Sequence, residues 1–137
     1  MNVTIIDGQG GQLGAGLVKE ITAQIENVNL TVVGTNALAT SAMLKAGAKN
    51  AATGENAVIV ACRKADVIIG PLGIVIADAL LGEITEKMAA AVGRAEAVRI
   101  LIPTNKCDNL VAGISLPTVK GLIDDAIEKL KGIISKA

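Results

Sequence analysis

The segment VTIIDGQGGQLGAGLVKE, residues 3–20, joins a hydrophobic strand to an amphipathic helix through a glycine-rich loop. Val3–Ile6 is a short apolar run of the kind found in strands that are covered on both faces of a parallel sheet. From Leu13 to Ile25 the apolar residues fall on one stripe of a helix. A buried strand, a tight loop and a helix in this order predict the first unit of an α/β domain.

The remainder of the chain repeats this alternation of apolar strands and amphipathic helices. Further strands are predicted at Leu30–Val33, Asn50–Thr53, Val67–Ile69, Val98–Ile102 and Leu110–Ile114. Helices are predicted at Ala37–Ala46, Glu55–Lys64 and Ile84–Ala95, with a last helix that opens at Pro117 near Thr118. A chain of 137 residues has the length of one ordinary domain, so we expect one domain over residues 1–137. We predict a three-layer, doubly wound, mostly parallel, Rossmann-like sheet with the strand order 3-2-1-4-5-6.

Composition limits the functions that the chain can have. Hydrophobic residues make up 51% of the 137 residues, the net charge is zero, and there is no Phe, Tyr, Trp or His. Without a basic patch or aromatic platforms for bases, nucleic acid is not expected as a partner. No apolar run reaches the ~18 residues of a membrane span, so we expect no membrane partner and, without a secretory signal, a cytoplasmic protein. The apolar excess instead predicts helices that are covered on both sides in a homo-oligomer.

The loop between the first strand and the first helix carries glycines at a spacing that suits a phosphate. Gly8, Gly11 and Gly14 follow a G-x-x-G-x-x-G pattern, and Gly10 adds a further glycine. Such glycines let the backbone approach a pyrophosphate, whose charge is stabilised by the N–H groups and the dipole of the following helix. We therefore predict that a phosphate-bearing small molecule binds at Gly8, Gln9, Gly10, Gly11, Gln12 and Gly14. The alternative is a tight strand-to-helix turn that binds nothing.

Asp7 places a carboxylate beside this loop, where it would repel a phosphate. We expect its oxygens to accept hydrogen bonds from the backbone of the loop and so to fix the turn. Two alternatives are contact with a ribose and a Mg²⁺ ion that offsets the charge. No metal site is predicted, because no second carboxylate is clearly placed to share an ion and the chain has no His and only two cysteines.

The stretch VVGTNALAT, residues 32–40, ends the second strand without the acid that a dinucleotide site usually has there for the ribose. It also lacks an arginine for a 2′-phosphate. Thr35 and Asn36 could form hydrogen bonds with a ribose or a phosphate, or could cap the next helix. NAD(P) is therefore a candidate cofactor, together with a mononucleotide or another phosphorylated metabolite.

Two further loops follow strands at the same predicted edge of the sheet. Gly70, Pro71 and Gly73 form a stiff surface that suits a flat ligand, or an ordinary turn before a helix. After the fifth strand, Lys106 could neutralise a phosphate and Cys107 could act as a nucleophile. Since the chain has no His to serve as a base, a solvated polar loop is the favoured interpretation there.

Several phrases of the sequence resemble a family of short bacterial proteins known as a domain of unknown function with a Rossmann-like, NAD(P)-binding character. These phrases are IIDGQGGQLG (5–14), GTNALATSAMLKAGA (34–48), ATGENA (52–57) and GPLGIVIADALLGEIT (70–85). The resemblance covers nearly the whole chain, implies a small protein without an established activity, and supplies no catalytic residues. A weaker likeness to short-chain dehydrogenases rests on Gly8, Gly11 and Gly14, but their catalytic tyrosine is missing because the chain has no Tyr.

The sequence leaves three classes of function open. Without His and Tyr, the available acids and bases are carboxylates, Lys and Cys, so no catalytic residue is assigned. We expect a binding or regulatory module for a nucleotide or another phosphate-bearing ligand. The alternatives are a small oxidoreductase or phosphate-handling enzyme completed at an oligomer interface, and a structural oligomeric module without a ligand.

Overall fold

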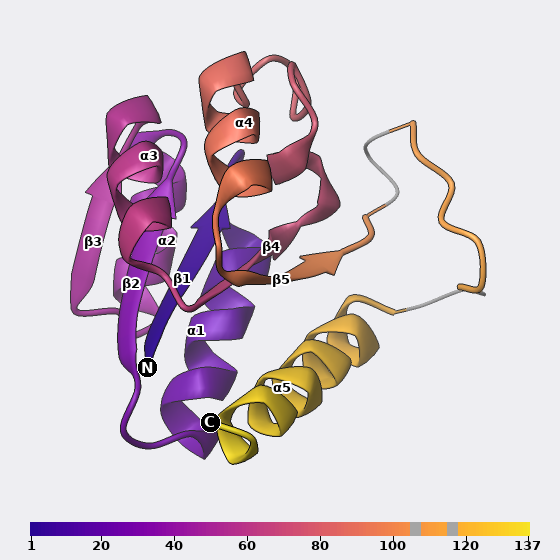
Figure 1. Ribbon diagram of the computed structural model, residues 1–137. Coiled ribbons are helices and arrows are strands. Elements are labelled where there is room, and N and C mark those ends of the chain that lie inside the picture. Colours follow the sequence, from indigo (N-terminus) through magenta and orange to yellow (C-terminus); the bar gives the residue numbers. More distant parts are fainter. Residues whose placement is uncertain (105–107, 115–117) are drawn as a thin grey trace.

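Five parallel strands form the sheet of the computed structural model, which describes residues 1–104, 108–114 and 118–137 (Figure 1). The strands are β1 (Asn2–Asp7), β2 (Asn29–Gly34), β3 (Asn50–Thr53), β4 (Val67–Pro71) and β5 (Val98–Ile102). Their order across the sheet is β3-β2-β1-β4-β5, and each neighbouring pair is parallel. The chain order therefore reverses between β1 and β4. Ligands of open α/β sheets bind at the carboxyl ends of the strands beside such a reversal point.

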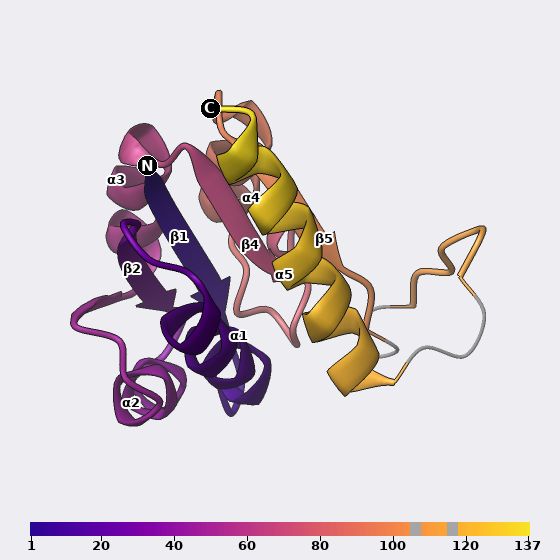
Figure 2. The same cartoon turned by 90° about the horizontal axis from the view of Figure 1, so that it is seen from below.

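Helices cover both faces of this sheet, as Figure 2 shows. One face carries α1 (Gln12–Gln24), α2 (Ala37–Lys45) and α5 (Val119–Ser135), and the other carries α3 (Glu55–Lys64) and α4 (Glu86–Arg94). A short 3₁₀ helix, η1 (Leu72–Val75), follows β4. The predicted three-layer, doubly wound fold is confirmed.

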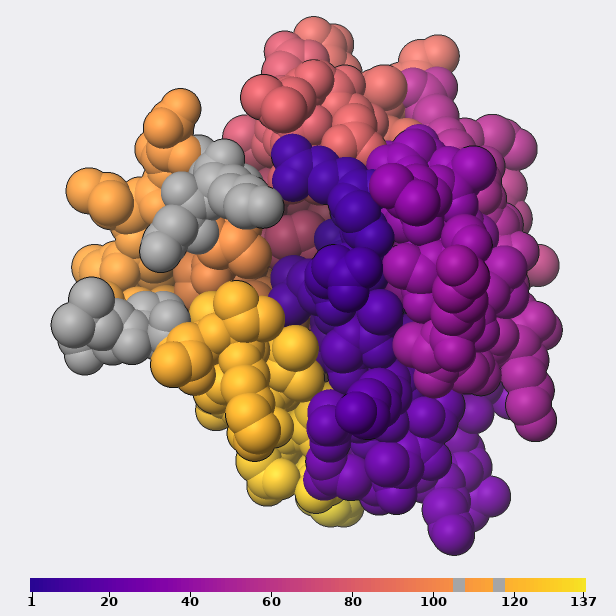
Figure 3. Space-filling view, turned by 180° about the vertical axis from the view of Figure 1, so that it is seen from behind, coloured from indigo at the N-terminus to yellow at the C-terminus, as the bar shows by residue number. Residues whose placement is uncertain are grey.

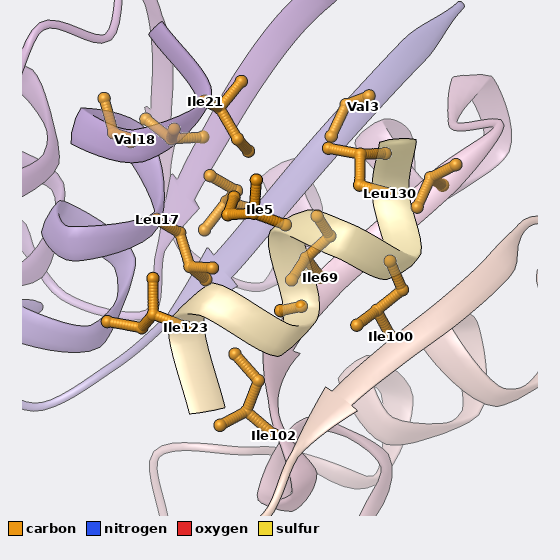
Figure 4. Packing of buried hydrophobic residues seen from close by; sticks show 14 of the residues in the cluster. Val3, Ile5, Leu17, Val18, Ile21, Ile69, Ile100, Ile102, Ile123 and Leu130 are labelled. Carbon is orange, nitrogen blue, oxygen red and sulfur yellow. The ribbon is translucent and has the colours of Figure 1, made fainter. Parts of the chain in front are cut away.

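The alternation of side chains along β1 explains the two buried clusters. Val3 and Ile5 belong to the cluster beneath α1 and α5, whereas Ile6 belongs to the cluster beneath α3 and α4. Figure 4 shows the first cluster, in which Ile123 and Leu130 of α5 lie over the sheet. Because β1 is buried on both faces, its sequence is a near-continuous apolar run rather than an alternating one.

The prediction of a strand at Leu110–Ile114 is wrong. Residues 110–114 form a loop with a turn at 112–113, in which Gly113 has a φ of 89°. This backbone angle is incompatible with a strand. The side chain of Leu110 is fully exposed to solvent. Within the described residues the sheet thus has five strands instead of six, and β5 is one of its edges.

The other predicted elements are confirmed, with ends that differ by at most two residues. The fourth helix begins at Glu86 instead of Ile84, because the Thr85 hydroxyl caps it by accepting a hydrogen bond from the Met88 N–H at 3.1 Å. Thr118 caps α5 in the same way, while Pro117 lies outside the described residues. None of the helices in the described ranges has the length and apolar character needed to cross a membrane.

Candidate functional site

Asp7 is the last residue of β1, and its carboxylate fixes the loop that follows. Oδ1 accepts a hydrogen bond from the Gly8 N–H at 2.8 Å, and Oδ2 accepts one from the Gly14 N–H at 2.7 Å. The residue is only 5% exposed. Burial raises the pKa of Asp7 above its ordinary value, although the two backbone N–H groups act against this shift. Asp7 therefore ties the strand to the first turn of α1, which confirms the expectation that it fixes the turn.

The glycines of this loop have different roles. Gly11 has a φ of 74°, a left-handed conformation that glycine favours, and its N–H donates to the Gly8 carbonyl at 2.9 Å. A Cβ atom at Gly11 would lie 2.7 Å from the Cα and carbonyl oxygen of Ala39, so this glycine lets α1 pack closely on α2. Gly14 also lies against α2. Gly10, in contrast, has open space where a Cβ atom would stand.

A pocket of about 470 Å³ opens beside the loop, at the point where the chain order of the sheet reverses. Its walls come from the loop and first turn of α1, the ends of β4 and β5, and the start of α5. They consist of Asp7, Gly8, Gln9, Gly10, Gly11, Gln12, Leu13, Pro71, Leu80, Ile102, Pro103, Thr104, Val119 and Leu122. Figure 3 shows this side of the molecule, with the indigo N-terminal segment between α5 in yellow and α2 in magenta.

Three backbone N–H groups at the pocket are available to a ligand. Among the described residues, the N–H groups of Gly10, Gln12 and Leu13 have no hydrogen-bond partner. They lie at the N-terminal end of α1, where unpaired N–H groups and the helix dipole give a partial positive charge. This arrangement suits the binding of an anion.

A second group of donors, on the β2 side of the loop, is already occupied by Glu83. The Gln9 N–H, the Thr35 hydroxyl and the Asn36 side-chain amide donate to Glu83 Oε1 at 3.1, 2.7 and 2.6 Å. We call these three donors the cradle. Thr35 and Asn36 reach it because β1 and β2 end level with each other, with the Thr35 N–H donating to the Asp7 carbonyl at 3.0 Å.

The cradle holds Glu83 as a carboxylate. Burial acts to raise the pKa of Glu83, but the hydrogen bonds from Thr35, Asn36 and Gln9 outweigh it and keep the pKa below its ordinary value. Within the described residues Glu83 forms no ion pair, so its charge is balanced by neutral donors alone. The cradle therefore already functions as an anion-binding site, with an anion supplied by the chain itself.

Glu83 reaches the cradle from residues 78–84, a loop between η1 and α4 that we call the strap. The Asp78 N–H donates to the Ile84 carbonyl at 2.7 Å, which closes the strap at its base. Asp78, Leu80 and Leu81 all have positive φ angles, of 67°, 57° and 57°, which cost a non-glycine residue about 1 kcal/mol each. Leu80 is buried and lines the pocket, whereas Leu81 is 97% exposed. The strap thus contributes Leu80 to the wall of the pocket and Glu83 to the cradle.

Six of the predicted binding residues line the pocket: Gly8, Gln9, Gly10, Gly11, Gln12 and Pro71. Gly14 packs behind the loop, and Gly70 and Gly73 are buried. At Gly70, a Cβ atom would overlap the carbonyl of Ile6, so this glycine lets β4 approach β1. Lys106 and Cys107 lie outside the described residues.

Thr35 and Asn36 contact Glu83 instead of the pocket. Asn36 also caps α2, because its Oδ1 accepts a hydrogen bond from the Ala39 N–H at 2.9 Å. The capping role considered for this segment is therefore confirmed for Asn36, which uses its two side-chain polar atoms for two different purposes.

The role of Glu83 is not apparent from the sequence. The acid that a dinucleotide site would have at the end of β2 is absent there, and a carboxylate from 48 residues beyond Thr35 stands in its place. The only local signal is the Gly82-Glu83 pair ahead of α4, which does not reveal the strand end that the side chain reaches. Where residues are described, no group of three or more His, Cys, Asp or Glu is placed to hold a metal ion.

Comparison with known proteins gives a family and distant structural likenesses. No curated protein matches the chain. A dodecameric FMN-dependent UbiX-like decarboxylase from Escherichia coli O157:H7 is similar in structure, with 18% identity and a TM-score of 0.48, over 96% of this chain and 76% of that chain. A likeness at this level carries no argument about the cofactor or assembly of the present chain. The family described as "Domain of unknown function (DUF3842)" matches residues 2–135, and the chain therefore belongs to this family.

Proposed function

We propose that the protein is a binding or regulatory module for a small phosphate-bearing ligand, which occupies the pocket at the N-terminus of α1. The observation that carries this proposal is the set of unpartnered N–H groups of Gly10, Gln12 and Leu13 at a pocket of about 470 Å³. This volume lies within the range of pockets for small molecules. Leu80, Ile102 and other apolar side chains of the walls suit an uncharged, flat part of the same ligand.

The size of the ligand follows from the position of Glu83. In a dinucleotide site the pyrophosphate lies at the N-terminus of the first helix, and the ribose of one of the two nucleotides lies at the end of β2. An acidic side chain there binds the hydroxyl groups of that ribose. Glu83 and the strap cover this position and occupy the donors of Thr35 and Asn36. A mononucleotide or a phosphorylated metabolite of similar size therefore fits the open pocket better than NAD(P).

The lining of the pocket supports binding over catalysis. Asp7 is the only titratable residue among the described residues that line it, and both of its oxygens accept backbone hydrogen bonds. General acid–base catalysis needs a titratable group within reach of the substrate. An enzyme built on this pocket would need such a group from another copy of the chain or from a partner.

A substitution at Gly10 tests the proposal without disturbing the fold. We expect Gly10→Val to leave the melting temperature of the free protein within about 1 °C of wild type, since the side chain enters open space. The same side chain would stand between a phosphate and the N–H groups, and should weaken binding at least tenfold, or about 1.4 kcal/mol. Calorimetric titration with AMP, GMP, FMN, NADP and inorganic phosphate measures this effect.

The matched control is Gly93→Val, at an exposed position of α4 where a Cβ atom also meets nothing within 4 Å. This variant should bind like wild type. The proposal fails if none of these ligands binds the wild-type protein, or if Gly10→Val binds them as tightly as Gly93→Val does.

We also propose that copies of the chain associate through the edge of the sheet at β5. Leu110 is fully exposed in the loop at residues 108–114, which projects from the body of the molecule in Figure 1. Val98 on β5 is half exposed, and a groove of about 630 Å³ runs between β5 and α5. An open strand edge beside exposed apolar side chains is a surface that proteins normally cover.

For this association we predict that Leu110→Asp lowers the mass in solution toward that of one chain, 13.8 kDa. The reason is that a charge replaces an apolar side chain at the contact. Light scattering after size exclusion measures the mass, and circular dichroism checks the fold. Leu81→Asp, equally exposed but on the strap, is the control and should keep the wild-type mass. A wild-type protein that is already monomeric would contradict the proposal.

A further inference from the structure

We propose that the cradle of Gln9, Thr35 and Asn36 is a second anion-binding subsite, which a phosphate or carboxylate group of a ligand enters by displacing Glu83 and the strap. This subsite uses donors different from those of the pocket and lies on the other side of the loop. The two proposals can therefore fail separately.

The donors of the cradle converge on one point. A backbone N–H, a hydroxyl and a side-chain amide, from two loops far apart in sequence, all donate to Glu83 Oε1 within 3.1 Å. Among the residues that the structure describes, the other oxygen, Oε2, accepts only from the Gln9 N–H, at 3.2 Å. Three convergent donors recognise an oxygen of an anion, whether it belongs to a carboxylate or to a phosphate.

The loop leaves room for an anion at Gly8. A Cβ atom at Gly8 would lie 2.7 Å from Thr35 Oγ1, 2.8 Å from a methyl of Leu80 and 3.3 Å from Glu83 Oε1. The absence of a side chain at Gly8 thus allows the carboxylate and the strap to lie directly on the loop. A small group on a ligand could use the same space once Glu83 has left.

The strap is built as a separable unit. Its base is closed by hydrogen bonds between Asp78, Ala79 and Ile84, so the turn is held together by its own backbone. Ile84 is buried beneath α4, whereas Leu81 at the tip is almost fully exposed. Leu80 and Glu83 attach the tip to the rest of the molecule. Three non-glycine residues with positive φ also make this conformation a strained one.

Displacement of the strap would join the two sites. Leu80 of the strap lines the pocket, and Glu83 of the same strap occupies the cradle. A ligand with two anionic groups could then span the loop, with one group on the α1 N–H groups and the other in the cradle. Glu83 would limit the protein to smaller ligands until a second anion competes for the cradle.

Amide resonances in NMR spectra test this inference at the level of single donors. We would titrate wild type, Glu83→Ala and Glu83→Gln with inorganic phosphate and, separately, with acetate, at constant ionic strength. In Glu83→Ala, one of these anions should shift the resonances of the Gln9 backbone amide and the Asn36 side-chain amide. Its dissociation constant should be at least tenfold lower than in wild type. Comparing the two anions identifies whether the cradle prefers a phosphate or a carboxylate.

Two further variants keep the test decisive. Glu83→Gln keeps one acceptor oxygen for the cradle without the charge, so it should stay folded if Glu83→Ala does not, and should also bind more tightly than wild type. Glu86→Ala removes an equal charge at an exposed position of α4 and should behave like wild type. Equal affinity in wild type and the Glu83 variants, or shifts confined to Gly10, Gln12 and Leu13, would overturn the inference. Shifts confined to Gly10, Gln12 and Leu13 would still support the proposal that an anion binds in the pocket.

Discussion

Replacing Asp7 with alanine should lower the free energy of unfolding by about 3 kcal/mol, measured by urea denaturation followed by circular dichroism. The carboxylate accepts hydrogen bonds from the N–H groups of Gly8 and Gly14, at 2.8 and 2.7 Å, in a buried position. Alanine would leave both donors without a partner, and each buried unpaired donor costs about 1–3 kcal/mol. The desolvation cost that disappears with the carboxylate offsets part of this loss.

Asp7→Asn is the informative partner variant, because it preserves size but not the pattern of acceptors. Its amide can accept from only one of the two N–H groups and turns an NH₂ group toward the other. We expect Asp7→Asn to be destabilised as well, by about 1–2 kcal/mol. If both variants are as stable as wild type, Asp7 does not hold the loop in place, and the basis for a preformed anion site is lost.

The pH dependence of the Asp7 contribution has a defined sign. Burial raises the pKa of Asp7 in the folded state above its ordinary value of 3.8, so the folded state binds this proton more tightly than the unfolded state. The stability of wild type relative to Asp7→Asn should therefore be greatest at low pH. It should fall as the pH rises from the ordinary pKa to the raised one, and should stay constant above it. Glu83, whose pKa is lowered, contributes with the opposite sign and loses its contribution as the pH falls below its ordinary value of 4.5.

The sequence was sufficient to predict the features that depend on local patterns. The buried strand before the glycine loop and the stripe of α1 follow from residues that are close together in the chain. Capping by Asn36 is one of the two roles that the local sequence allows, and the structure selects it. The strand order was also correct for the first five strands, because right-handed crossovers leave few alternatives. These features place the carboxyl end of β1, and with it the loop, beside the reversal point of the sheet.

The sequence was insufficient where a side chain acts far from its own element. Glu83 follows β4, but its carboxylate accepts hydrogen bonds from a cradle beside β2. This contact depends on the path of a strap with three unusual backbone angles. The apolar run Leu110–Ile114 was wrongly assigned to a strand, since exposed apolar residues in a projecting loop have the same local pattern as a short buried strand. A correct prediction of either feature requires the three-dimensional positions of the strap and of this loop.

Replacing Gly11 with alanine should be more damaging than any other single change in the loop, with a loss of about 3–4 kcal/mol in the free energy of unfolding. Gly11 has a φ of 74°, which an alanine tolerates poorly, and its new Cβ would lie 2.7 Å from the backbone of Ala39. Because the opposing atoms are backbone, relief would require α1 and α2 to separate. Urea denaturation of Gly11→Ala measures the loss.

Gly10→Ala is the control for this variant, since it adds the same methyl group one residue earlier, into open space. Its stability should stay within about 0.5 kcal/mol of wild type. The pair separates the two uses of glycine in this loop, because one position serves the packing of α1 on α2 and the other leaves the backbone open to the pocket. If Gly11→Ala were as stable as Gly10→Ala, the approach of the two helices would not require glycine there. The spacing of the glycines would then have to be explained by a ligand and not by the fold.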